Sequence, residues 1–241
     1  MCRVLLEAGD GTPIERGESV MWGVSPFNSF YSSATIRCLI HWSVPRFDRV
    51  YVLLAGPEAA RRFISAGMAP RKAVAKVMTQ VHQQRRAAQR AIRTAGYAHS
   101  DRDVIVWSRL AGNARYLELR SLIRQAYETE PNVREVVRAT TELALAAAAG
   151  GRSAAEVVDA NVDYVFAETP VVLDAAALLS HDHTVFAYHR RFPLFDYLAT
   201  GAVPALAPGP GQVYAQLTLT PEAPHAVPCE PLGHRLPPPD R

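Results

Sequence analysis

Residues 20–32 have the sequence V-M-W-G-V-S-P-F-N-S-F-Y-S, an apolar run that ends at a glycine and is followed by one serine. The run at 18–24 predicts a short buried strand, and the polar residues at 25–29 predict the turn that follows it. In an open parallel sheet, reactive groups gather at the carboxyl ends of the strands. The stretch therefore predicts either a reactive Ser25 at such an end or a turn serine that caps the next helix.

Strands and helices alternate along the rest of the chain. Continuous apolar runs predict strands at 49–55, 103–108 and 184–189. Helical spacing of apolar residues predicts helices at 30–42, 58–64, 69–94, 113–127, 132–149, 153–166 and 193–198. This alternation predicts an α/β fold with a Rossmann-like, mainly parallel sheet that has helices on both faces.

The length of 241 residues favours a single large domain, expected at residues 1–203. Residues 204–239 hold ten of the chain's 18 prolines, which excludes a helix there. We expect residues 204–241 to form a proline-rich extension that is partly disordered and carries one strand at 211–219.

No apolar run approaches the roughly 20 residues that span a bilayer, and Glu7 and Asp10 interrupt the start of the chain. The three cysteines show no paired spacing, so we expect no disulfide framework and a small buried apolar role for Cys38. His181 and His183 lack further ligands nearby, and we expect no metal site. These features predict a cytoplasmic protein without a membrane segment.

Positive charge is concentrated in one part of the chain. The formal net charge is only +3, but residues 59–100 carry nine Lys and Arg residues and no Asp or Glu. Arg86, Arg90 and Arg93 share one helix face, with Lys76 and Arg85 nearby. A solvated helix face is the simpler explanation, but exposed helices usually mix charges of both signs. The segment therefore predicts a surface for a polyanion such as RNA.

The turn at Ser25 differs from the nucleophile turn of the common serine hydrolases. The segment G-V-S-P-F lacks the second glycine of G-x-S-x-G, and Pro26 would disturb the helix that follows that motif. The chain also contains no Walker A loop and no G-x-G-x-x-G motif, so we expect no nucleotide cofactor.

Three segments together resemble the signatures of the tRNA-dependent cyclodipeptide synthases. They are G-V-S-P-F-N-S at 23–29, Y-V-F-A-E-T-P at 164–170 and T-V-F-A-Y-H at 184–189. Each segment is weak alone, but three in order across residues 1–200 make a specific pattern. The resemblance implies a domain similar to the catalytic domain of class I aminoacyl-tRNA synthetases, without ATP binding.

The resemblance also implies the reaction. Two aminoacyl-tRNAs would be joined into a cyclic dipeptide, a 2,5-diketopiperazine, through an aminoacyl ester on Ser25. Tyr164 and Glu168, four residues apart on one helix face, would hold the α-amino group, with Glu168 moving its proton. Tyr188 would relay protons during ring closure. The enzyme would act as a monomer without metal or cofactor.

Further roles follow from the same resemblance. Asn28 would orient the serine loop or bind substrate, and a simple turn-forming role for it remains open. His189 would belong to the substrate-binding residues. The basic helix would bind the tRNA acceptor stem by its phosphates. The pocket for the first side chain would be apolar and include Met21, Gly23, Val52, Trp107 and Val171.

Two other functions remain compatible with the residues alone. A serine esterase or acyltransferase acting on small esters would also use Ser25 as its nucleophile. A non-catalytic RNA-binding module would keep the basic helix and use Ser25 only as a cap.

Overall fold

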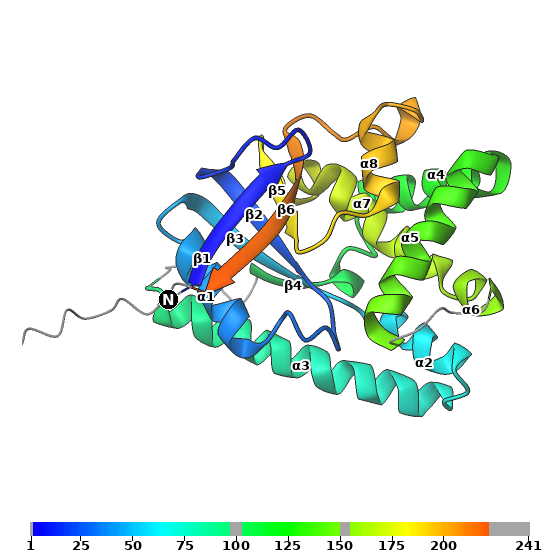
Figure 1. Cartoon of the computed structure of the whole chain (residues 1–241), viewed down its shortest axis with the longest axis horizontal. Helices are drawn as coiled ribbons and strands as arrows, with labels where there is room; N and C mark the ends of the chain where they lie inside the picture. Colours follow the sequence, from blue (N-terminus) through cyan, green and yellow to red (C-terminus); the bar gives the residue numbers. More distant parts are fainter. Residues whose placement is uncertain (1, 97–102, 150–154, 222–241) are drawn as a thin grey trace, which may run out of the picture.

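A six-stranded sheet forms the centre of the protein in a computed structural model that describes residues 2–96, 103–149 and 155–221 (Figure 1). The strand order is β1-β6-β5-β2-β3-β4. All neighbouring strands are parallel except β1, which runs antiparallel to β6. The predicted α/β fold with a mainly parallel sheet is confirmed. The strands are β1 (Cys2–Ala8), β2 (Gly17–Val24), β3 (Phe47–Leu54), β4 (Val104–Val106), β5 (Thr184–Tyr188) and β6 (Gln212–Pro221).

The strand β2 lies in the middle of the sheet, between β5 and β3. Its last six residues are buried, as are all five residues of β5. Side chains therefore pack on both faces of these strands, which explains why their sequences are continuous apolar runs. In the register of the sheet, Met21 lies opposite Phe186 and Trp22 opposite Ala187.

The helices form two groups (Figure 1). In the first group, α1 and α3 pack against each other and on β3. In the second group, α7 packs on β5 and β6, and α4 and α5 pack against α7. The helices are α1 (Ser33–Ser43), α2 (Arg61–Ser65), α3 (Pro70–Thr94), α4 (Ala114–Thr129), α5 (Pro131–Ala149), α6 (Ala155–Asp159), α7 (Val162–Leu179) and α8 (Pro193–Ala199), with short 3₁₀ turns η1 (Pro57–Ala60), η3 (Trp107–Arg109) and η4 (Pro204–Leu206).

Local signals set several helix ends. The hydroxyl of Ser32 accepts a hydrogen bond from the backbone N–H of Thr35 and caps α1, and the side chain of Asn113 caps α4 in the same way through Tyr116. Gly96, just after α3, has φ of 70°. A residue with a side chain rarely adopts this backbone conformation, so glycine suits the end of the helix.

The sequence patterns did not place the first and last strands in the central sheet. In β1, Val4 and Leu6 are buried whereas Leu5 is 36% exposed, so its short alternation belongs to a half-buried edge strand. The strand expected at 211–219 is present as β6, which pairs with both β1 and β5. Residues 212–221 therefore pair within the same sheet as the strands of residues 1–203. Residues 222–241 lie outside the described part.

The helix predicted at 153–166 is broken in the structure. The described helix α6 ends at Asp159, and α7 begins at Val162 and continues through Pro170. Buried Asn161 occupies the break and donates hydrogen bonds to the carbonyl of Val157 and the hydroxyl of Ser65. Polar side chains that satisfy nearby groups outside helical geometry end helices in this way. Ser153 lies outside the described residues.

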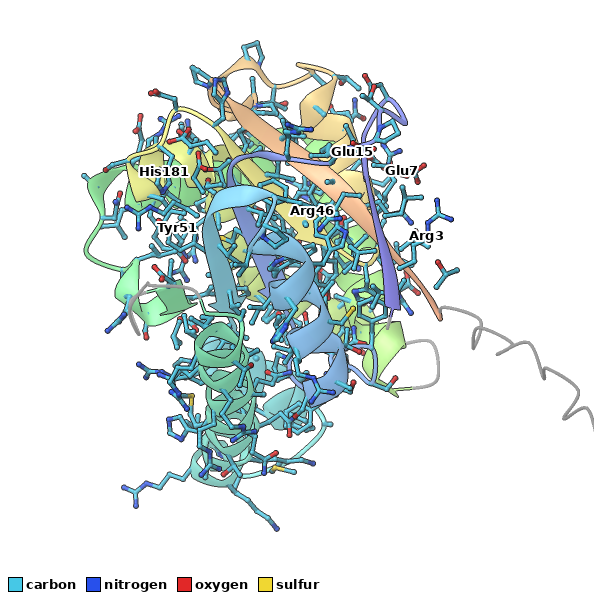
Figure 2. All side chains as sticks on the ribbon, turned by 90° about the vertical axis from the view of Figure 1, so that its left-hand side faces the viewer. Arg3, Glu7, Glu15, Arg46, Tyr51 and His181 are labelled. Atoms are coloured by element: carbon cyan, nitrogen blue, oxygen red, sulfur yellow. The ribbon has the colours of Figure 1, made fainter. Side chains whose placement is uncertain are left out.

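Two predictions about isolated side chains meet different outcomes. Cys38 is disulfide-bonded in the structure, which corrects the expectation that it has only a small buried apolar role and that no disulfide forms. His181 lies beside Tyr51 (Figure 2) and forms hydrogen bonds of 2.7 Å to the Tyr51 hydroxyl and 3.1 Å to Glu18. Its two ring nitrogens thus already have protein partners.

Within the described ranges, no group of three or more His, Cys, Asp or Glu side chains is arranged to hold a metal ion. None of the helices in the same part of the chain is both long and apolar enough to cross a membrane.

Candidate active site

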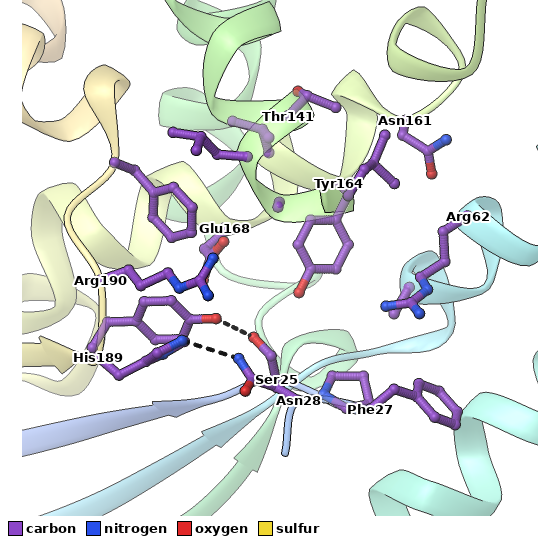
Figure 3. Close-up of a pocket in the computed structure, with 18 residues that line it drawn as sticks. Ser25, Phe27, Asn28, Arg62, Thr141, Asn161, Tyr164, Glu168, His189 and Arg190 are labelled. Atoms are coloured by element: carbon purple, nitrogen blue, oxygen red, sulfur yellow. Dashed lines mark hydrogen bonds between the residues drawn. The ribbon is translucent and has the colours of Figure 1, made fainter. Parts of the chain in front are cut away.

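A cavity of about 750 Å³, counting its open mouth, lies where β2 and β5 end. Ser25 directly follows β2, Tyr188 is the last residue of β5, and α7 supplies Tyr164 and Glu168. All four predicted catalytic side chains line this one cavity, and Asn28 and His189 line it with them (Figure 3). The parallel strands thus bring together segments that are far apart in the sequence, as expected for the carboxyl edge of an α/β sheet.

Ser25 is held on two sides. Its hydroxyl oxygen lies 2.6 Å from the hydroxyl oxygen of Tyr188, a short hydrogen bond between the ends of β2 and β5. Its backbone carbonyl accepts a hydrogen bond of 3.0 Å from the side chain of Gln84 on α3. The serine is therefore a fixed, hydrogen-bonded group at the cavity wall rather than a helix cap, a role that Ser32 performs.

Asn28 holds the turn after Ser25 in place. Its Oδ1 accepts a hydrogen bond from the backbone N–H of Phe30, and its Nδ2 lies 3.1 Å from Nε2 of His189. An amide NH₂ can only donate, so Nε2 accepts and the proton of a neutral His189 sits on Nδ1, which faces the Tyr31 hydroxyl at 3.3 Å. Burial lowers the pKa of His189 to about 4, which keeps the ring neutral at pH 7.

Glu168 is a carboxyl group enclosed by protein. Burial raises its pKa from 4.5 to about 7. Among the residues that the structure describes, none forms a hydrogen bond with its carboxylate, which faces the cavity. A carboxyl group with a pKa near neutrality and a free face can exchange a proton with a bound amine.

Tyr164 lies one helical turn from Glu168, and its hydroxyl points towards Ser25 (Figure 3). Burial, and then the charge of Glu168, raise the pKa of Tyr164 well above its usual value. The same two causes raise the pKa of Tyr188. Both phenols therefore remain protonated at pH 7 and can donate hydrogen bonds to a substrate.

Gly23 provides space for protein rather than for a ligand. A Cβ atom at this position would lie 2.9 Å from Cζ of Phe186 and 3.1 Å from Cδ2 of Tyr188. The missing side chain thus lets the Tyr188 ring pack over β2 and reach Ser25. Contact of Gly23 with the first substrate side chain stays a prediction.

The other predicted pocket residues are not among those that line the cavity. Trp107 is buried, and its ring centroid lies 4.9 Å from that of Tyr164, so it packs against the Tyr164 ring. Met21, Val52 and Val171 are each at most 1% exposed and pack in the core. Residues on strands that are covered on both faces become core, and contact of these four residues with a substrate side chain stays a prediction.

Several side chains at the site were not predicted from the sequence. Gln84 lies on the apolar stripe of α3 with Val77, Val81 and Ala88. A polar residue on such a stripe needs a hydrogen-bond partner, and this signal in the sequence could have identified Gln84. Arg62 on α2 and Thr141 on α5 have no comparable signal, because only tertiary packing brings them to the cavity. The cavity walls that the sequence did not indicate are formed by Phe27, Ala59, Arg62, Thr141, Leu143, Ala144, Leu145, Asn161, Val165, Arg190 and Phe192.

The predicted RNA-binding residues lie along α3. Lys76, Arg86, Arg90 and Arg93 are exposed, and α3 contains no acidic residue. Arg85 is partly buried, and its Nε has no hydrogen-bond partner among the described groups. The helix therefore presents a face of one charge sign.

Substituting Glu168→Gln should stabilise the folded protein at pH 8 and leave its stability unchanged at pH 4. Above about pH 7 the folded state carries the cost of a buried charge, whereas the unfolded chain ionises near the ordinary value of 4.5. Wild-type stability therefore falls as the pH rises between these two values. We expect the variant to gain about 1–3 kcal/mol at pH 8 in urea denaturation.

The exposed Glu128 on α4 offers a matched control, since Glu128→Gln changes the same chemical group without removing a buried charge. A Glu168→Gln protein no more stable than wild type at pH 8 would contradict the assigned pKa shift.

Substituting Gly23→Ala should lower the free energy of unfolding by about 1–3 kcal/mol, because the added methyl group meets the fully buried ring of Phe186. The measurement is chemical denaturation of the variant beside Gly112→Ala, whose added Cβ meets nothing within 4 Å. Equal stability of the two variants would show that Phe186 and Tyr188 can move aside.

The model of the cyclodipeptide synthase family matches residues 10–219 of the chain. The cyclo(L-leucyl-L-leucyl) synthase of Bacillus subtilis is 33% identical over 191 residues, which cover 77% of this chain and 76% of that protein.

Solved structures share the fold. A cyclodipeptide synthase from Bacillus thermoamylovorans superposes with a TM-score of 0.79 at 28% identity, over 85% of this chain and 90% of the other. A Mycobacterium tuberculosis protein, described as demonstrating that cyclodipeptide synthetases are related to type I tRNA synthetases, has a TM-score of 0.72 at 24% identity, over 85% and 87%. The match along nearly the whole described sheet, together with the three sequence segments gathered at one cavity, leads to one conclusion: this chain belongs to the cyclodipeptide synthase family, enzymes that make cyclodipeptides by aminoacyl transfer.

Proposed function

We propose that the protein joins two aminoacyl-tRNAs into a cyclic dipeptide by ping-pong catalysis through an aminoacyl ester on Ser25. The observation that carries this proposal is the 2.6 Å contact between the Ser25 and Tyr188 hydroxyl groups in the cavity that Tyr164 and Glu168 also line. A nucleophile, a proton relay and a group that holds an amine are thereby within reach of one substrate.

In the first step, the Ser25 oxygen attacks the ester carbonyl of the first aminoacyl-tRNA. The ester bond to the ribose breaks, and the proton of the serine hydroxyl ends on the released ribose oxygen by way of Tyr188. This exchange of one ester for another is close to neutral in free energy, so no ATP is needed.

In the second step, the α-amino group of the amino acid on Ser25 attacks the second aminoacyl-tRNA. Glu168, with a pKa of about 7, takes the proton that the ammonium must lose before it can attack. Tyr164 lies beside Glu168 and orients the amine through its hydroxyl. The ester bond to the second ribose breaks, and the ribose oxygen takes the proton that the attacking nitrogen loses as the amide forms. The products are a dipeptidyl ester on Ser25 and the second free tRNA.

In the last step, the terminal amine of the dipeptide attacks the Ser25 ester carbonyl. A six-membered ring closes as the bond to the serine oxygen breaks, and the proton that the attacking nitrogen loses passes to the serine oxygen by way of Tyr188. Amide formation from an ester is favourable, which drives the sequence to completion.

The walls of the cavity support apolar amino acids as substrates. Leu145, Val165 and Phe192 line it, and Glu168 is the only carboxylate among the lining residues that the structure describes. The similar Bacillus subtilis protein is a cyclo(L-leucyl-L-leucyl) synthase. We therefore propose an aliphatic or aromatic residue in the product.

The surroundings of Ser25 favour this reaction over small-ester hydrolysis. Its hydroxyl bonds to a tyrosine, whereas the histidine at the cavity, His189, is held by Asn28. A serine hydrolase would need a histidine on the serine and a carboxylate on the histidine.

Ser25→Ala should abolish cyclic dipeptide formation because no covalent intermediate can form. The measurement is mass spectrometry of the culture medium after expression in a bacterial host. Intact-protein mass spectrometry of the wild type with a single aminoacyl-tRNA should show one aminoacyl adduct on Ser25. Product formation by the alanine variant would reject the covalent course.

The basic face of α3 should make tRNA binding dependent on salt. Replacing Arg86 and Arg90 together by Gln should weaken tRNA affinity and reduce the slope of log affinity against log salt by about two, because each phosphate that an arginine neutralises adds roughly 0.9 to that slope. Arg3→Gln on β1 is the control, because this exposed arginine lies far from α3 (Figure 2). An unchanged salt slope in the double variant would reject the assignment.

A further inference from the structure

Two phenylalanines form a pair beside the catalytic serine. Phe27 lines the cavity two residues after Ser25, and Phe63 lies on α2. Their ring centroids are 5.0 Å apart in an edge-to-face arrangement. Phe27 has φ of 62°, a left-handed conformation that is unusual for a bulky residue and is typical of functional turns.

Two cations cover both rings of this pair. The guanidinium carbon of Arg62 lies 5.4 Å from the centroid of Phe27 and 4.6 Å from that of Phe63. The ammonium nitrogen of Lys76 lies 5.7 Å and 4.3 Å from the same centroids. These are cation–π distances, so the rings hold a cation from α2 and a cation from α3 in one place.

Neither cation has a carboxylate to balance it within the described ranges. The neighbouring Arg61, by contrast, forms an ion pair of 2.8 Å with Asp163. Like charges held near the same two rings repel each other, and burial lowers the pKa of Arg62, which shows that its charge is poorly solvated. A bound anion would relieve both costs.

We propose that Arg62 and Lys76 form a clasp for the phosphodiester backbone of the unpaired 3′ end of the tRNA. This inference rests on the proposed tRNA-dependent reaction and adds to it a docking site for the end of the substrate. The ester that Ser25 attacks is carried by the terminal ribose, so the first phosphates of the strand must lie within one or two nucleotides of Ser25.

The position of the clasp fits this requirement. Arg62 lines the cavity, and Figure 3 shows Arg62 and Phe27 on the side of the cavity away from His189 and Arg190. Lys76 lies on α3, the helix whose remaining basic residues would contact the paired stem. Because the cations already cover the ring faces, we assign the rings the role of holding the cations rather than of stacking bases.

The test compares the binding of two probes. One is a tRNA that carries no amino acid, and the other is the same tRNA without its unpaired 3′ nucleotides. Arg62→Gln and Lys76→Gln should each weaken binding of the complete tRNA about tenfold, as for the loss of a hydrogen bond to a charged group. Each should also reduce its salt slope by about 0.7, the value for single strands. Binding of the truncated tRNA should stay unchanged.

Arg124→Gln is the matched control. Arg124 also lies over a phenylalanine, 5.7 Å from the ring centroid of Phe166, but Asp163 already balances it at 2.8 Å. This variant should bind both probes like the wild type. A further variant, Phe63→Leu, tests the role of the ring, because it removes the ring but keeps both charges. It should weaken binding of the complete tRNA about two- to fivefold.

Three outcomes decide the inference. Loss of the preference for the complete tRNA in the Arg62 and Lys76 variants supports the clasp. Preserved preference in both variants overturns the clasp and leaves the tRNA-dependent reaction standing. If wild-type protein binds neither probe, the proposed use of tRNA fails and the clasp fails with it.

Discussion

The parallel pairing of β2 with β5 is the constraint on which the arrangement of Ser25 and Tyr188 depends. It sets Met21 opposite Phe186 and Trp22 opposite Ala187, so the chain leaves both strands at the same edge. Ser25 and Tyr188 then meet at 2.6 Å. A shift of one residue in this register would turn the Tyr188 ring to the other face of the sheet and break the contact. Gly23 permits the contact between Ser25 and Tyr188 in this register, because a side chain at position 23 would collide with the Tyr188 ring.

The electrostatics of the site depend on burial more than on neighbouring charges. Burial raises the pKa of Glu168 to about 7 and is also the largest cause of the raised pKa values of Tyr164 and Tyr188. Burial raises the pKa of an acidic group because the protein interior solvates its charged form poorly. The result is one carboxyl group with a pKa near 7, that of Glu168, beside the two protonated phenols of Tyr164 and Tyr188. The buried Glu168 carboxylate therefore lowers the folding stability above about pH 7.

Outside the cavity, positive charge is concentrated on the helices next to Ser25. The acid-free segment from residue 59 to 100 contains α2 and α3. Arg62 lines the cavity, and Lys76 lies over the same phenylalanine ring as Arg62. Gln84 on α3 holds the backbone of Ser25. The helix that carries the basic face thus also holds the backbone of the proposed nucleophile. A polyanion bound along α3 would direct its end towards the serine.

The sequence alone determined the mainly parallel α/β sheet, the strand that precedes Ser25 and the four-residue spacing that sets Tyr164 and Glu168 on one helix face. These features follow from short-range patterns, namely continuous apolar runs, helical spacing and three local motifs. The edge strand β1, the place of β6 in the sheet and the break at Asn161 were decided only by tertiary structure, because each depends on partners far along the chain. The same holds for Gly23, whose empty space is filled by residues more than 160 positions away, and for Arg62, which reaches the cavity only when α2 packs beside it. Local sequence specifies which elements form, whereas the walls of a cavity are specified by how those elements pack.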